Sequence, residues 1–397
     1  MTIGIDVSKG KSMMAAITDT KEIVLAPKEY LHTKDGLAHL VAEISALKST
    51  VKIVMESTGH YHEPVAYALK AAGFYVSVLN PILMYGYGSN SIRGIKTDKK
   101  DSLKLARYAL DNINELREYE SQETIRSQLK MFSRQYNISI KTMHALQNHL
   151  ISILDKTLPD VNKLFSCVRR KDGHQKWLDF AASFVHAEEI TDKSQFTKEY
   201  KIWCAQKKYR FTLKKAHEIY AKYQDVVTTM PNNQNTRLLI QTSASQIQGI
   251  NITLTTVKAE MTRLAQLLPE YQAVLSFFGV GELTAAQLIA EIGDVRRFHS
   301  RGALIAFAGT DPTPKQSGTY NKKSTNISKR GSAPLRKTLF QIICTYLRHS
   351  PQNEPVYIFL DKKREEGKPY FVYMTAAANK FLKIYYAKIT KLMQELE

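Results

Sequence analysis

Four acidic side chains stand where carboxylates can converge on a metal ion. Asp6 ends a short apolar stretch near the N-terminus, and Glu56 directly follows the apolar residues 51–55. Asp98 and Asp101 are three residues apart at a predicted helix start, which puts both on one helical face. Their oxygen ligands suit Mg²⁺ or Mn²⁺, and two such ions about 4 Å apart can stabilise a phosphodiester displacement. Each acid alone is an ordinary turn residue or helix cap, but together they predict a metal-dependent site.

The elements that must position these acids are alternating strands and helices. Apolar runs and turn residues predict strands over 3–7, 13–18, 23–26, 51–55 and 75–79, and helices over 33–47, about 64–73 and 98–111. This order, three strands followed by helix, strand, helix, strand and helix, is typical of an RNase H-like α/β fold. We therefore assign residues 1–115 to an α/β catalytic domain.

The middle of the chain, residues 116–270, is predicted to be helical. Apolar residues from Ile247 to Leu268 alternate at spacings of three and four, which is typical of a coiled-coil seam. A basic, aromatic-rich helical insertion is predicted over about 158–234. Its Arg169–Lys171 and Lys207–Lys208 clusters are either contacts to a nucleic-acid backbone or ordinary solvated surface.

Charge separates the two ends of the chain. The net charge is +19 over 397 residues, yet residues 1–120 carry 15 basic and 14 acidic groups, and residues 301–350 carry nine basic groups and one acid. Such asymmetry favours binding to a polyanion, although a solubilising surface is the alternative. No apolar run is long enough to span a membrane, no signal peptide is recognisable, and the three cysteines form no C-x-x-C pair. We expect a cytoplasmic protein without a membrane partner.

The last third, residues 271–397, is expected to form a small, mainly α-helical domain. Gly279 and Gly281 precede a predicted helix, where backbone N–H groups can hold a phosphate; a tight turn between helices is the alternative. Ser317 lies beside Gly318, which permits close approach of a strand. A serine needs activation to become a nucleophile, and sequence alone favours a turn residue. The basic side chains expected to contact nucleic acid are Arg93, Lys96, Lys315, Lys322, Lys323, Lys329, Arg330, Arg336 and Lys337.

Several short motifs, taken in order, resemble the DEDD transposases of the IS110 insertion-sequence family. They are Gly4–Lys9, Val54–Tyr61, Asn80–Pro81 with Arg93, Lys96–Asp98 and Asp101, then Gly279–Gly281, Ala290–Asp294, Phe307–Pro312, Gln316–Gly318 and Ser328–Gly331. The resemblance spans roughly residues 3–110 and 275–345. Thr310 departs from it, because a leucine is expected there. Residues 158–234 match no motif of the family.

The resemblance implies a RuvC-like domain whose acids Asp6, Glu56, Asp98 and Asp101 bind Mg²⁺, and a C-terminal transposase domain in which Ser317 is the nucleophile. It also implies a dimer or tetramer that excises and inserts donor DNA into target DNA, guided by a structured bridge RNA. A serine–phosphate linkage would conserve the bond energy for rejoining, so that no ATP is needed.

Other function classes share some of these features. A RuvC-like junction nuclease would use the same acids to activate water and leave Ser317 idle. A non-catalytic nucleic-acid-binding protein would need none of these five residues. An actin-like or sugar-kinase ATPase also ends its first strand in an acid, but residues 7–11 contain one glycine where a phosphate loop needs several.

Overall fold

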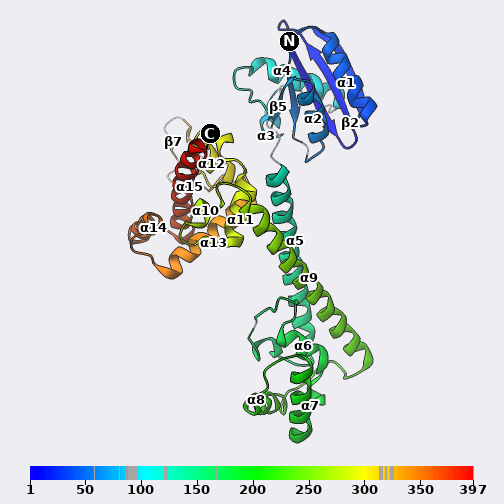
Figure 1. The fold of residues 1–397 in the computed structure, drawn as a ribbon, viewed down its shortest axis with the longest axis vertical. Coiled ribbons are helices and arrows are strands. Elements are labelled where there is room, and N and C mark those ends of the chain that lie inside the picture. The colour runs from blue at the N-terminus through cyan, green and yellow to red at the C-terminus, as the bar shows by residue number, and fades with distance from the viewer. Residues whose placement is uncertain are drawn as a thin grey trace. The chain divides into compact units, whose positions relative to one another are not determined.

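The structure is a computed structural model. It describes residues 1–57, 59–79, 81–85, 87, 97–119, 124–166, 168–312, 316–317, 320–321 and 326–396. The chain divides into two compact units, Met1–Ser121 and Gln122–Glu397 (Figure 1). Each unit is described by itself.

The first unit is built on a five-stranded sheet. Its strands are β1 (Thr2–Ser8), β2 (Lys11–Ile17), β3 (Ile23–Leu31), β4 (Lys52–Glu56) and β5 (Tyr75–Leu79). The spatial order is β3-β2-β1-β4-β5, in which the first three strands are antiparallel while β4 runs parallel to both β1 and β5. Its helices are α1 (Lys34–Ala46), α2 (Glu63–Ala71), α3 (Pro81–Tyr85) and α4 (Asp98–Asp111).

Helices cover both faces of this sheet. On one face, Ile5 and Met55 pack in a buried core with Leu40 of α1 and Val65 of α2. On the other face, Val54 packs with residues of α4. The alternation follows from the strand period of two, which sends successive side chains to opposite faces. The first unit is therefore a three-layer α/β domain.

The elements predicted from the sequence and those in the structure differ at two places in this unit. Strand β3 continues through Pro27 to Leu31, whereas the sequence pattern predicts a strand over 23–26. Because β3 pairs only with β2, it is an edge strand, where a proline removes no necessary ladder bond. Helix α3 is too short to show a helical period, and it was not expected.

Two long helices organise the second unit. Helix α5 (Thr124–Leu154) and helix α9 (Gln234–Gln266) pack side by side (Figure 1). The end of α5 and the start of α9 share one buried core, while the start of α5 and the end of α9 share another. The two helices are therefore antiparallel. Of the alternating apolar residues, Ile250 is half-buried, and the others are buried: Ile247, Leu254, Val257, Met261, Leu264 and Leu268.

The segment between these helices forms a core of its own. It contains the short turns η1 (Val161–Lys163) and η2 (Ala187–Glu189) and the helices α6 (Lys176–Ser183), α7 (Lys193–Gln206) and α8 (Leu213–Tyr223). Aromatic rings dominate its interior, where Phe180, Tyr200 and Trp203 contact one another. Burial of these large rings is what holds the short helices together.

The C-terminal elements form the other core of the second unit. They are α10 (Tyr271–Leu275), α11 (Glu282–Ile292), η3 (Val295–Arg297), α12 (Arg301–Ala308), β6 (Gln316–Ser317), β7 (Tyr320–Asn321), α13 (Ala333–His349), α14 (Pro355–Glu365) and α15 (Tyr370–Glu395). Residues 285–292 of α11 are all buried. A helix that is buried on every side is a central helix, and α11, which includes the buried polar residues Gln287 and Glu291, contacts α5, α9 and α13.

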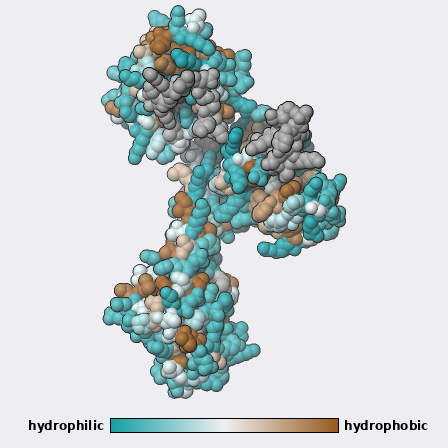
Figure 2. Space-filling model, turned by 180° about the vertical axis from the view of Figure 1, so that it is seen from behind, coloured by the Kyte–Doolittle hydropathy of each residue, from teal (hydrophilic) through white to brown (hydrophobic). Residues whose placement is uncertain are grey.

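Figure 2 shows small hydrophobic patches scattered among hydrophilic side chains on the face that it displays. Within the described residues, no helix combines the length and the apolar character that a bilayer crossing needs.

Candidate functional site

Asp6 and Glu56 occupy neighbouring positions on two adjacent strands of the sheet. The parallel pairing of β1 with β4 places Ile5 opposite Met55, so the next residues along each strand are these two acids. Since adjacent strands in register point their side chains to the same face, both acids leave the sheet on the face opposite the Ile5 and Met55 core. Both are half-buried. This is the face that α4 covers.

The contacts of α4 with β1 define which residues of the helix reach these acids. Thr2 Oγ1 donates a hydrogen bond to the carbonyl of Ala106 at 2.9 Å. A Cβ atom on Gly4 would lie 2.1 Å from the carbonyl oxygen of Ser102. A step of two residues along β1, about 6.6 Å, thus corresponds to a step of four residues back along α4, about 6 Å. The helix therefore runs antiparallel to the strand. One more step of this register brings Asp98 level with Asp6.

Asp98 and Asp101 both lie in the first turn of α4. Thr97 caps this turn, because its side chain accepts a hydrogen bond from the N–H of Lys100. The pKa of Lys11, on β2, is raised chiefly by its hydrogen bond to Glu29, and in smaller part by the charge of Asp98. Asp98 therefore lies near the end of β1 and β2 that carries Asp6.

The chemistry of this donor set fits a hard divalent cation. Four carboxylates at two strand ends and one helical turn supply only oxygen ligands. Among the residues that the structure describes, however, no three His, Cys, Asp or Glu side chains stand close enough together to hold a metal ion. The fold brings the acids to one end of the sheet, and it does not by itself assemble a coordination sphere.

Ser317 lies in the second unit on the two-residue strand β6. This strand pairs with β7 in antiparallel register, with Ser317 opposite Tyr320. An isolated bridge between Pro312 and Ile327 closes the chain excursion that contains both strands. The lysines 315, 322 and 323 fall in this excursion, and Arg93 and Lys96 fall in the first unit; all five lie outside the described residues.

The base of the excursion is held by backbone contacts that only glycine permits. A Cβ atom on Gly331 would lie 1.9 Å from the carbonyl oxygen of Phe307, and one on Gly309 would lie 2.6 Å from the N–H nitrogen of Gly331. Gly309 also has a φ of +66°, which L side chains rarely adopt. These contacts fix where the chain leaves and re-enters the helical core.

The remaining basic candidates have different surroundings. Lys329 and Arg330 are exposed beside the re-entry point. Arg336 has structural partners, because its Nη1 donates to the carbonyls of Ala308 and Gly331 at 2.9 and 3.0 Å. Lys337 is exposed, and its Nζ donates to Asn137 Oδ1 at 3.1 Å.

Gly279 and Gly281 lie in a turn directly before α11, as the sequence predicts. Gly279 has a φ of +76°, and Gly281 caps the helix in an extended conformation. Glu282 occupies the first turn, so the helix already has the negative charge that its N-terminus favours. This carboxylate opposes a phosphate at the same place.

Three residues make contacts that the sequence does not predict, because their partners are distant in the chain. Glu291 is 1% exposed, and its Oε2 accepts a hydrogen bond from Ser332 Oγ at 2.8 Å. Asp311 Oδ1 accepts one from Ser328 Oγ at 2.7 Å, across the base of the excursion. Thr310, the departure from the family pattern, is buried and donates from Oγ1 to Asn379 Oδ1 of α15 at 2.6 Å.

Comparison with known proteins gives consistent matches at both ends of the chain. A family model for DEDD transposases of the IS110 type matches residues 3–159, and the model described as the IS116/IS110/IS902 transposase family matches residues 271–357.

Individual relatives include proteins that invert or move DNA segments. The chain is 23% identical to the pilin gene-inverting protein of Moraxella lacunata over 392 residues, which cover 98% of this chain and 95% of that protein. It is 38% identical over 91 residues to the transposase for insertion sequence element IS1111A of Coxiella burnetii, covering 23% of this chain and 24% of that transposase.

Proposed function

The chain belongs to the IS110 family of transposases, and from this we propose that it is the recombinase of an insertion sequence that cuts and rejoins DNA through a phosphoserine intermediate. One observation carries the proposal furthest: the α4 register brings Asp98 level with Asp6 on the face of the sheet where Glu56 also projects. We propose the RNase H-like, RuvC-like fold for this domain and a coiled coil for the α5–α9 pair.

In this proposal Asp6, Glu56, Asp98 and Asp101 hold Mg²⁺ or Mn²⁺. Because no three of the described acids are preassembled, these carboxylates would have to move closer together to hold the cation. The bound cation would supply positive charge that stabilises a phosphate under attack. The acids themselves would hold and orient the cation.

Ser317 is proposed as the nucleophile. Its oxygen forms a bond to a DNA phosphorus as the bond from phosphorus to the leaving sugar oxygen breaks. The serine proton is released, and the leaving oxygen takes one up. Rejoining reverses these changes with the sugar oxygen of another strand and restores the free serine. The exposed Lys329 and Arg330 beside the excursion would offset phosphate charge.

The proposed partners are donor DNA, target DNA, a structured guide RNA and further copies of this chain in a dimer or tetramer. If the RNA pairs with the DNA, then the protein reads the shape of the duplex and not its sequence. The basic second unit suits this role, because residues 121–270 carry 22 basic and 13 acidic groups. Sequencing the nucleic acid that copurifies from cells holding the gene with its flanking DNA tests it: one discrete RNA is expected, and random RNA would contradict guidance.

The chemical proposal is tested by trapping the intermediate. Full-length protein is incubated with labelled DNA from those flanks, the copurified RNA and Mg²⁺, and then denatured. A covalent protein–DNA adduct is expected with wild-type protein and with Ser276→Ala, which changes an exposed serine elsewhere in the same unit. It should be absent with Ser317→Ala. An adduct with Ser317→Ala would refute the assignment, and cleavage without any adduct would favour the junction nuclease.

Single substitutions test the acids in the same assay. Asp6→Asn, Glu56→Gln, Asp98→Asn and Asp101→Asn should each slow adduct formation by about 10²–10³-fold, as does removal of one group that stabilises transition-state charge. Asp35→Asn, an exposed acid in the first turn of α1, is the control and should leave the rate unchanged. Equal rates for all five variants would refute the metal site.

A further inference from the structure

The segment between α5 and α9 brings two basic clusters together. Residues 164–176 and 207–215 contain nine lysines and arginines and one acid, Asp172. Arg170 connects the two stretches, because its Nη1 donates to the carbonyl of Lys207 at 2.9 Å. Its Nη2 pairs with Asp172 at 2.6 Å. The single acid of these stretches is therefore already engaged, and the surface they share is positively charged.

These stretches line an open groove of about 630 Å³. This volume lies within the roughly 300–1,000 Å³ of typical ligand sites. Phe165 and Tyr209 supply aromatic walls, and Lys176, Arg210 and Lys215 supply charge together with Arg170. The lining thus combines flat apolar faces with cations.

Lys176 lies among the aromatic rings of this groove. Its Nζ is 5.3 Å from the ring centre of Phe165 and 5.5 Å from that of Tyr209. It donates to the carbonyl of Arg210 at 3.0 Å. Burial lowers its pKa, with a further small effect of the Lys215 charge. Within the described part of the chain, no carboxylate lies within ion-pair distance of this ammonium, so an entering anion would supply its counter-charge.

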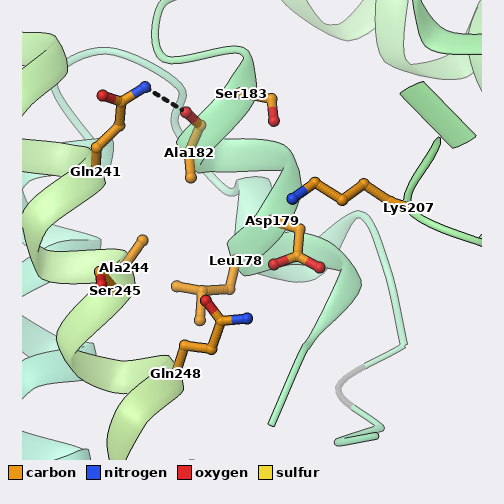
Figure 3. Close-up of a pocket in the computed structure, with 9 residues that line it drawn as sticks. All are labelled: Leu178, Asp179, Ala182, Ser183, Lys207, Gln241, Ala244, Ser245 and Gln248. Carbon is orange, nitrogen blue, oxygen red and sulfur yellow. Dashed lines mark hydrogen bonds between the residues drawn. The ribbon is translucent and has the colours of Figure 1, made fainter. Parts of the chain in front are cut away.

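The Tyr209 ring is held in place by a hydrogen bond to a buried carboxylate. Tyr209 donates its hydroxyl to Asp179 Oδ2 at 2.5 Å, and Asp179 is 7% exposed. His174 Nδ1 is hydrogen-bonded to the same carboxylate at 2.8 Å. On its other side Asp179 faces a smaller crevice of about 290 Å³ between α6 and α9, where Lys207 extends toward it (Figure 3). That crevice has no aromatic wall, so the groove is the better site for a flat ligand.

We propose that this groove binds an unpaired nucleotide of a nucleic-acid strand. The base stacks on Phe165, beside Tyr209, and the phosphate is held by Lys176, Arg210 and Lys215. Stacking on an aromatic ring tolerates every base and requires that the base be free of a duplex. RNA and DNA share this chemistry. The inference rests on the proposed function only in that the chain encounters nucleic acid.

Photo-crosslinking of the full-length protein tests the site. The probes are single-stranded oligo(U) containing 4-thiouridine and oligo(dT) containing 4-thiothymidine, and crosslinked peptides are identified by mass spectrometry. Crosslinks are expected in residues 164–176 or 207–215. Stronger labelling by one probe identifies RNA or DNA as the source, and equal labelling indicates recognition of features that both share. Excess unlabelled duplex should compete poorly at these peptides.

Matched variants separate a groove from general surface charge. Lys176→Gln, Arg210→Gln and Lys215→Gln, combined, should lower crosslinking at these peptides at least about tenfold, since three phosphate contacts are removed. Lys193→Gln, Lys198→Gln and Lys201→Gln remove the same charge from exposed positions of α7 and should change it less than about twofold. Equal losses in both triple variants would overturn the proposal.

An aromatic pair gives a test at constant charge. Phe165→Leu should lower crosslinking about tenfold by removing a stacking face, whereas Phe211→Leu should not, because Phe211 is half-buried in the same core but does not line the groove. Unchanged thermal melting would show that both variants fold. Crosslinks confined to other parts of the chain would overturn the inference and leave the proposed function intact, since failure of that function appears in the Ser317 adduct assay.

Discussion

The backbone of Gly4 lies directly against the carbonyl of Ser102, at a distance that leaves no room for a side chain. A Cβ atom there would lie 2.1 Å from this oxygen and 2.4 Å from the N–H nitrogen of Ala106. Both neighbours are backbone atoms of α4, which cannot rotate away. The closeness of this contact sets the height of Asp98 and Asp101 above the sheet.

Gly4→Ala should therefore displace α4 and loosen the acid site. We expect a loss of stability of about 1–3 kcal/mol, typical of overpacking, and at least a tenfold slower adduct formation. Denaturant unfolding and the adduct assay measure the two effects. Ser102→Ala is the matched control: it keeps the carbonyl that Gly4 meets and loses the hydrogen bond from Ser102 Oγ to the carbonyl of Lys99. It should cost at most about 1 kcal/mol and leave adduct formation unchanged. Unchanged adduct formation by Gly4→Ala would show that the height of α4 is not important for the reaction.

The pair of Thr310 and Asn379 predicts coupling between two distant parts of the chain. Thr310→Val keeps the shape of the side chain but leaves Asn379 Oδ1 without its donor. An acceptor left without its donor in this half-buried pair costs about 1–3 kcal/mol. Asn379 Nδ2 also donates to the Thr310 carbonyl at 3.3 Å, so the two residues share more than one contact. The double variant Thr310→Val with Asn379→Leu should therefore lose less stability than the sum of the two single variants. Urea unfolding of the three variants measures these losses, and additive losses would contradict the pairing.

A buried ion pair joins the start of α5 to α10. Arg126 and Glu270 are 5% and 3% exposed, and Arg126 Nη2 lies 3.0 Å from Glu270 Oε2. Removing one partner leaves a buried charge without its counter-charge, so Arg126→Met should lower the free energy of unfolding by about 3–5 kcal/mol. Arg126→Met with Glu270→Leu should recover much of this loss. Arg263→Met, which breaks the exposed pair with Glu260 on α9, is the control and should leave the denaturant midpoint unchanged.

The buried imidazole of His62 predicts a pH-dependent stability of the first unit. Burial lowers its pKa below the ordinary 6.5, and its Nδ1 has no hydrogen-bond partner. The unfolded chain therefore binds a proton more readily than the folded chain. Stability contributed by the neutral ring is complete above about pH 6.5 and is lost as pH falls from there toward the lowered folded-state pKa.

Unfolding measured across this pH range tests the role of His62. His62→Asn should flatten the fall in unfolding free energy below pH 6.5. His39→Asn, at an exposed position of α1, should leave the slope as in the wild type. His32 contributes in the same direction, because burial also lowers its pKa, so some slope should persist in His62→Asn. An identical slope in all three proteins would contradict the argument.

Local pattern determined much of this protein. The period of the strands, the helix that begins after Thr33, the acids at strand ends and the alternation of apolar residues in α9 follow from residues near one another in the chain, and the structure contains these elements. The motifs also predicted the family. Side-chain period and capping are short-range effects, which is why a single sequence reveals them.

Tertiary structure alone decided the contacts between distant segments. The approach of Gly4 to Ser102, the Thr310–Asn379 pair and the meeting of residues 164–176 with 207–215 depend on packing across many intervening residues. Arg336 is a similar case. Its charge predicts a contact with nucleic acid, whereas in the fold it donates hydrogen bonds to two backbone carbonyls. The sequence gives the charge and type of each residue. The partner of a side chain is decided only when burial brings the elements together, because polar groups removed from water must then find partners within the protein.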